Sequence, residues 1–176
     1  MMRPGHRYLW SGAAAGINVT LQRQNVGTTA WVTIGAAKTV TGGIASVPFT
    51  SSINGNFRAV LASSVPGETV LTPAIAASSV ATVGWRSAPG TATRNVTAAY
   101  EVTASPYDAG NVAHLQVRKP GTTTWTTVRS VAVPTTRIAR MTYAFPTAGA
   151  WGIRVYRAPT TQHTGGLSPV ITTTVK

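Results

Sequence analysis

The chain has 176 residues, of which 43% are apolar and only 10% are charged, against roughly 25% charged in typical globular domains. Fifteen basic and three acidic residues give a net charge of +12, and the absence of cysteine excludes a disulfide scaffold and a thiolate metal site. No apolar stretch approaches the roughly 20 residues of a membrane-spanning helix. Thr and Val favour pleated, half-buried surfaces, so the composition favours β structure.

The first half of the chain contains short segments in which apolar and polar residues alternate. Val19 and Leu21 alternate with Thr20 and Gln22, and a period of two indicates half-buried strands. No window carries a sustained helical period with caps. Turn residues separate the segments at the spacing of an all-β sandwich: Asn25-Val26-Gly27, Thr41-Gly42-Gly43, Asn54-Gly55 and Pro66-Gly67.

The second half repeats this organisation. Residues 76–94 are rich in Ser, Ala, Gly and Pro, and we interpret them as a short linker followed by a first strand at 80–85. Residues 113–117 then alternate as 19–23 do. Later turn signals are Pro120-Gly121, Ala148-Gly149 and Gly165-Gly166.

The most informative pattern is an internal repeat of roughly 95 residues, about the length of a sandwich domain. Leu21 and Leu115 lie 94 residues apart, as do Trp31 and Trp125. Residues 57–60 match 153–156, and 71–75 match 167–171, both at a separation of 96. The sequence therefore predicts two tandem antiparallel β-sandwiches, at residues 1–78 and 79–176.

The first sandwich is predicted to lack its opening strand. Residues 100–103 align with 6–9, so the counterpart of the strand at 80–85 would fall before residue 1. Either the native polypeptide extends further upstream, or another chain fills the place. An open sheet edge pairs readily with another strand, so we expect protein neighbours in an assembly.

The repeated motif resembles the immunoglobulin-like and fibronectin-type-III-like modules of secreted actinobacterial proteins. Similar sandwiches also occur on phage heads and tails. The resemblance implies tandem Ig-like sandwiches without a shared active site. Its first copy is carried by Gly16, Val19, Leu21, Gln22, Arg23, Trp31, Thr33, Ile34, Phe57, Arg58, Ala59, Pro73 and Ile75.

The sequence contains few groups that could carry catalysis or bind a metal. Its carboxylates are Glu68, Glu101 and Asp108, and Asp108 lies in a turn-like segment. No histidine stands at ligand spacing from another. We therefore predict no catalytic residue, no metal site, no cofactor, no small-molecule substrate and no enzymatic activity.

The predicted surface residues fall into three groups. Gln22 with Arg58, and Gln116 with Arg154, should point outward on neighbouring strands, where they could form a contact surface or simply hydrogen-bond to each other. The second group comprises Arg129, Arg137 and Arg140, candidates for an anionic polymer. The third comprises candidate interface residues: Tyr8, Trp10 and Trp85.

The leading functional hypothesis is a non-catalytic structural or adhesive module of a secreted or cell-surface bacterial protein. It would lie outside the cell or in the cell envelope, assembling with neighbours or with an anionic surface. One alternative is a phage virion protein that decorates the head or forms part of the tail. A nucleic-acid binder is a third, motivated only by the net charge of +12.

Overall fold

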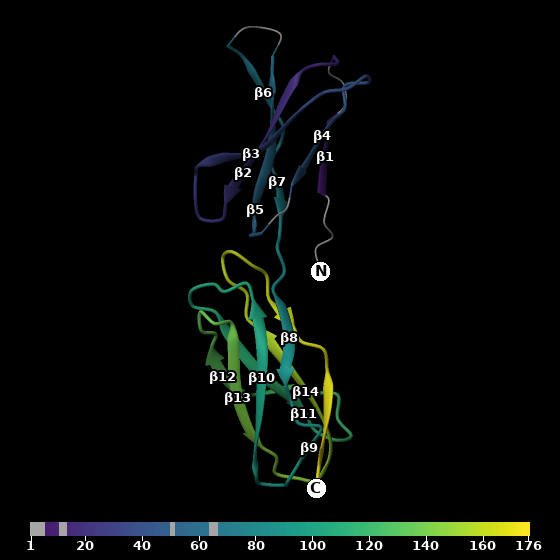
Figure 1. Cartoon of the computed structure of the whole chain (residues 1–176), viewed down its shortest axis with the longest axis vertical. Helices are drawn as coiled ribbons and strands as arrows, with labels where there is room; N and C mark the ends of the chain where they lie inside the picture. The colour runs from purple at the N-terminus through teal and green to yellow at the C-terminus, as the bar shows by residue number, and fades with distance from the viewer. Residues whose placement is uncertain (1–5, 11–13, 50–51, 64–66) are drawn as a thin grey trace. The chain divides into compact units, whose positions relative to one another are not determined.

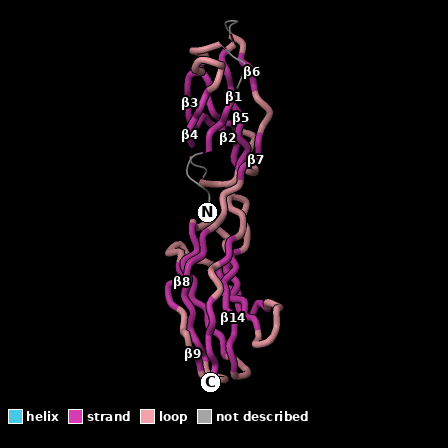
Figure 2. The backbone as a smooth tube through the Cα atoms, turned by 90° about the vertical axis from the view of Figure 1, so that its right-hand side faces the viewer, coloured by secondary structure: helices cyan, strands magenta, loops and turns pink. Residues whose placement is uncertain are grey.

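The computed structural model describes residues 6–10, 14–49, 52–63 and 67–176. All regular structure in this part of the chain is β (Figure 2). The described residues therefore contain no helix that is long and apolar enough to span a membrane. The chain divides into two compact units. Unit 1 comprises Met1–Ser79 with Thr161–His163, and unit 2 comprises Val80–Thr160 with Thr164–Lys176.

Unit 2 is a two-sheet sandwich of mainly antiparallel strands (Figure 1). One sheet has the order β13-β10-β8, and the other has the order β12-β11-β14-β16-β9, with β15 beside β14. Only the short β9 runs parallel to its neighbour, β16. The chain thus crosses repeatedly between the two sheets, with β8, β10 and β13 in one and the remaining strands in the other, as in an immunoglobulin-like sandwich. The strands are β8 (Thr82–Ser87), β9 (Thr91–Ala92), β10 (Thr97–Ser105), β11 (Val112–Arg118), β12 (Thr126–Ala132), β13 (Ile138–Ala144), β14 (Gly149–Arg157), β15 (Gly166–Leu167) and β16 (Ile171–Val175).

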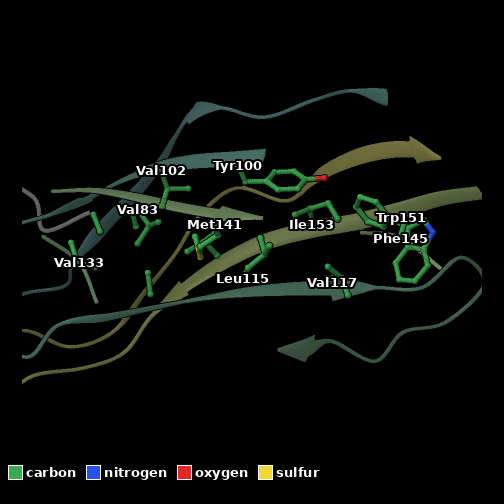
Figure 3. Close-up of a cluster of buried hydrophobic side chains, with 14 of the residues drawn as sticks. Val83, Tyr100, Val102, Leu115, Val117, Val133, Met141, Phe145, Trp151 and Ile153 are labelled. Carbon is green, nitrogen blue, oxygen red and sulfur yellow. The ribbon is translucent and has the colours of Figure 1, made fainter. Parts of the chain in front are cut away.

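The core of unit 2 is made by the inward residues of both sheets (Figure 3). Tyr100, Leu115 and Ile153 are fully buried, and Trp151 packs edge-on against Phe145 with ring centroids 5.2 Å apart. Alternation along the strands puts these side chains on one face, as the period of two predicts. Burying each such side chain stabilises the fold by about 1.5–3 kcal/mol.

Unit 1 repeats the architecture with fewer strands. Its sheets are β1-β4 and β3-β2-β5-β6, with β7 also paired to β5. The prediction of an all-β, tandem Ig-like fold is therefore confirmed. The strands are β1 (His6–Trp10), β2 (Asn18–Asn25), β3 (Trp31–Lys38), β4 (Ala45–Phe49), β5 (Gly55–Ala62), β6 (Thr69–Leu71) and β7 (Ile75–Ala77).

The two units share local features that follow from the repeat. Leu21 and Leu115 are both fully buried, and each is followed by a register irregularity in the pairing with the next strand, β3 or β12. The hydroxyl of Thr72 accepts a hydrogen bond from the amide of Ala59 at 2.9 Å. Ser168 and Val155 form the same bond, also at 2.9 Å.

A proline next to each of these hydroxyl residues explains why the last strand of each unit is interrupted. A proline follows each hydroxyl residue, at Pro73 and Pro169, and proline has no amide hydrogen for the ladder. The strand breaks there into β6 and β7 in unit 1 and into β15 and β16 in unit 2. The hydroxyl oxygen meanwhile satisfies an amide of the neighbouring strand.

The units differ where the sequence predicts a missing strand. In unit 2, β10 pairs with β13 on one side and β8 on the other. Its counterpart β1 pairs with β4, and among the described residues no strand lies on its second edge. Likewise, no described strand of unit 1 corresponds to β9.

A pH dependence follows from the buried phenol of Tyr100. Burial raises its pKa above the ordinary 10.0, and the hydrogen bond to Thr173 offsets this in part. Above pH 10 the unfolded chain releases this proton before the folded chain does, so stability falls as pH rises through the folded pKa. We expect the free energy of unfolding, measured with urea, to fall less steeply above pH 10 in Tyr100→Phe than in the wild type. Equal slopes for wild type and variant would contradict this.

Candidate interaction surfaces

A stack of three side chains lies on the outer face of the larger sheet of unit 1. Gln22 of β2 is directly opposite Arg58 of β5, and Arg58 Nε donates a hydrogen bond to Gln22 Oε1 at 2.9 Å. The Arg58 guanidinium lies over the ring of Trp31, 4.1 Å from its centroid. Gln22 and Arg58 point outward because Leu21 and Phe57 point inward.

Unit 2 contains the same stack with one further arginine. Arg154 Nε donates to Gln116 Oε1 at 2.8 Å, and its guanidinium lies 4.3 Å from the centroid of the Trp125 ring. Arg118 also approaches this ring, at 5.2 Å. A Cβ at Gly152 would lie 3.3 Å from the Trp125 ring, so the glycine gives the stack its space.

The stacks limit what these surfaces can bind. A guanidinium over an aromatic ring is a favourable cation–π contact, worth about 0.5–1 kcal/mol at an exposed site. It also covers a face of the ring, which is then closed to a stacking sugar. The predicted cross-strand hydrogen bonds are present in both units. That these residues also form a contact surface stays a prediction.

The three arginines predicted to meet an anionic polymer have different surroundings. Arg129 lies exposed on β12, and Arg137 lies in the turn before β13 with a left-handed φ of 64°. Arg140 is engaged within unit 2, because its Nε contacts Glu101 Oε1 at 2.6 Å. Arg86 contacts the other oxygen of Glu101 at 3.5 Å. The free cationic surface therefore lies at Arg129 and Arg137 more than at Arg140.

The predicted interface residues are described only in part. Tyr8 and Trp10 lie on β1, whose backbone is described, but their side chains lie outside the described part of the structure. Trp85 is half-buried against the core of unit 2, with its ring 6.0 Å from that of Tyr100. Its Nε1 donates to Pro169 O at 2.8 Å. Trp85 thus has a structural role in its own sandwich, and contact with a partner stays a prediction.

A buried ion pair at one end of unit 2 was not predicted from the sequence. Arg157 Nη2 lies 2.5 Å from Asp108 Oδ2, and the two side chains are 0% and 4% exposed. Thr160 Oγ1 donates to the same carboxylate oxygen at 2.6 Å. Asp108 was predicted to be only a turn residue. The inward alternation of Trp151, Ile153 and Val155, continued by two, would have placed Arg157 in the core.

The described carboxylates form no obvious catalytic pair. Asp108 is engaged by Arg157, and Glu101 by Arg140 and Arg86, on different parts of unit 2. Glu68 lies exposed in the loop before β6. In the described part of the chain, no three His, Cys, Asp or Glu side chains gather into a group that could hold a metal.

Comparisons with known proteins add little to this picture. No protein-family model and no curated protein matches the chain. Two solved chains, each a marsupial T cell receptor, are similar at TM-scores of 0.38 and 0.39, with 10% and 8% sequence identity over 90% and 91% of this chain. The chain spans 63% of each receptor chain. The sandwich assignment rests on the strand order and pairing described above.

The buried ion pair yields a stability prediction. Asp108→Asn leaves the Arg157 charge buried without its counterion, so we expect a loss of about 3–5 kcal/mol in the free energy of unfolding. The double variant Asp108→Leu/Arg157→Met should recover much of this loss. Urea unfolding followed by tryptophan fluorescence measures both. Glu101→Gln, which breaks the exposed pairs, is the matched control and should cost less than about 1 kcal/mol.

Proposed function

We propose that this protein is a non-catalytic, tandem Ig-like module with a structural or adhesive role in an assembly outside the cytoplasm. The observation that carries the proposal is the difference between the two units. The edge of β10 is covered by β8, whereas the corresponding edge of β1 has no described partner. An uncovered strand edge is a ready template for pairing with another chain.

The chemistry of the described side chains supports a non-catalytic role. Glu101 and Asp108 are both held by arginines, and a carboxylate fixed in an ion pair is poorly placed to accept or donate a proton to a substrate. The hollow between β12 and β13, about 410 Å³, is lined by aliphatic and small side chains with Arg140 beside it. Its lining includes the hydroxyl of Thr136 but no carboxylate or imidazole that could activate it.

Two settings fit such a module. A cell-surface or secreted bacterial protein is the first, since sandwich domains without cysteine can fold on their core alone. A phage virion, on its head or tail, is the second. Both settings place many copies of a chain against neighbours, where strand edges and basic surfaces are useful.

The experiment that tests the assembly role exploits the absence of cysteine. Leu9→Cys puts a single thiol on the open edge of unit 1, and a thiol-specific cross-linker is applied in the native source. We expect a recurrent, discrete adduct with another protein chain. Thr136→Cys, in an exposed turn of unit 2, is the control and should not give the same adduct. Recovery of only the free chain, from the cytoplasm, would contradict the proposal.

A second candidate role, binding of an anionic polymer, is favoured by the net charge of +12 and by the exposed Arg129 and Arg137. Neutralising anionic groups releases counterions, so affinity for polyphosphate or duplex DNA should fall steeply with salt. Arg129→Glu and Arg137→Glu should each reduce the slope of log affinity against log salt by about one. Lys38→Glu, an exposed charge of unit 1, is the matched control. Salt-independent affinity would contradict this role.

A further inference from the structure

The internal repeat shows which part of a sandwich is uncovered in unit 1. The strands β1 and β10 are counterparts, because β1 pairs with β4 as β10 pairs with β13. At a separation of 94 residues, Tyr8 corresponds to Val102 and Trp10 to Ala104. In unit 2 these two positions lie opposite Trp85 and Val83 of β8.

Strand β8 contributes both hydrogen bonds and apolar cover to unit 2. Val83 is 4% exposed and belongs to the core, and Trp85 packs against the same cluster while its indole reaches Pro169. Beside them Ile171 of β16 is half-buried against that core. Strand β8 therefore covers the core of unit 2 on the side where Ile171 of β16 lies.

Unit 1 exposes apolar side chains on the corresponding side. Ile75, the counterpart of Ile171, is 57% exposed, and Val70 and Leu71 on the neighbouring β6 are 48% and 51% exposed. Leu71 is no more exposed than its counterpart Leu167, which is 52% exposed in unit 2, so the apolar exposure that sets unit 1 apart is that of Ile75. Together with the unpaired edge of β1, the exposed Ile75 marks a place for one added strand.

We propose that unit 1 takes up a single extended strand from a different protein chain, antiparallel to β1, in the register that β8 has on β10. The proposal names a partner for the assembly role above and rests on it. The added strand would place one large apolar residue opposite Tyr8 and a β-branched residue opposite Trp10, as Trp85 and Val83 are placed in unit 2. Backbone pairing supplies affinity, and the alternate side chains supply specificity.

The added strand must be short at one end. A Cβ at Gly166 would clash with the backbone oxygen of Ala81, so the path of β8 before Thr82 depends on that glycine. The residue of unit 1 at the corresponding place is Val70, which carries a full side chain. The part of an added strand that corresponds to residues 83–87 can therefore pair with β1 as β8 pairs with β10. The residues that precede this part cannot take the path of Ala81, because the side chain of Val70 occupies it.

A different chain is the better source than a second copy of this one. The β8 strand of any copy is already paired within its own unit 2, and removing it would uncover Val83 and part of that core. The remaining way for two copies to meet is edge to edge, β1 against β1. That arrangement pairs the backbones but brings no equivalent of Trp85 to the exposed Ile75.

The test uses the full chain and a labelled peptide of residues 80–92 as a stand-in for the donated strand. We expect saturable binding by fluorescence anisotropy and at least a tenfold rise in hydrogen-exchange protection of residues 6–10, about the effect of pairing a frayed strand. Protection of residues 100–105 should not change. A control peptide with Val83→Pro and Trp85→Pro lacks two ladder amides and should not bind.

Three results would overturn the proposal. One is no binding of the wild-type peptide up to about 1 mM, a limit that corresponds to very weak affinity. Another is altered protection at 100–105, which would mean that the peptide exchanges with β8. The last is a peptide-free dimer in sedimentation with residues 6–10 already protected, which would mean that a second copy closes the edge.

A chimera guards against a peptide that fails for reasons of solubility. Residues 80–99 are joined directly to His6 in place of residues 1–5, so that unit 1 receives the segment that precedes Tyr100 in unit 2. Protection at residues 6–10 of the original numbering should rise at least tenfold, and no rise would count against the proposal. If Leu9→Cys cross-links in the native source but peptide and chimera both fail, the assembly role stands and strand addition falls.

Discussion

The antiparallel pairing of β2 with β5, repeated as β11 with β14, determines most of both units. One register places Leu21 and Leu115 in the core, fully buried, and the same register forces Gln22 opposite Arg58 and Gln116 opposite Arg154 on the outer face. Since side chains alternate along a strand, a slip by one residue would bury the arginines. The tryptophan stacks depend on this pairing too, because Arg58 and Arg154, which lie over the rings of Trp31 and Trp125, are placed by it.

Features of the fold that arise from local sequence patterns could be predicted, whereas those that arise from contacts between distant residues could not. The period of two and the repeat were enough for the strands, for the inward Leu21 and Phe57 and for the cross-strand Gln–Arg pairs. The ion pairs of Arg157 with Asp108 and of Arg140 with Glu101 join residues 49 and 39 positions apart. No periodicity encodes such pairs, because they form only when strands from different parts of the chain are brought together.

The buried pair and the exposed pair have opposite consequences although their chemistry is the same. Arg157 and Asp108 are removed from water, so each is costly without the other, and together they fix the loop after β10 to the end of β14. Arg140 and Glu101 are held on a solvated face, where ion pairs contribute little to stability. The exposed pair instead lowers the local positive charge, and this leaves Arg129 and Arg137 as the more available cations.

The two edges of the β1–β4 sheet are not equally protected. Strand β4 carries Pro48, which cannot donate to a ladder, and proline within a sheet is characteristic of an edge strand that resists further pairing. Strand β1 contains no proline, although its second edge is the one that β8 covers in unit 2. Proline is not required on every edge, since β8 and β13, the edge strands of the matching sheet in unit 2, contain none. A proline on β4 and none on β1 leaves β1 as the edge of this sheet at which every described residue keeps an amide hydrogen for pairing with a further strand.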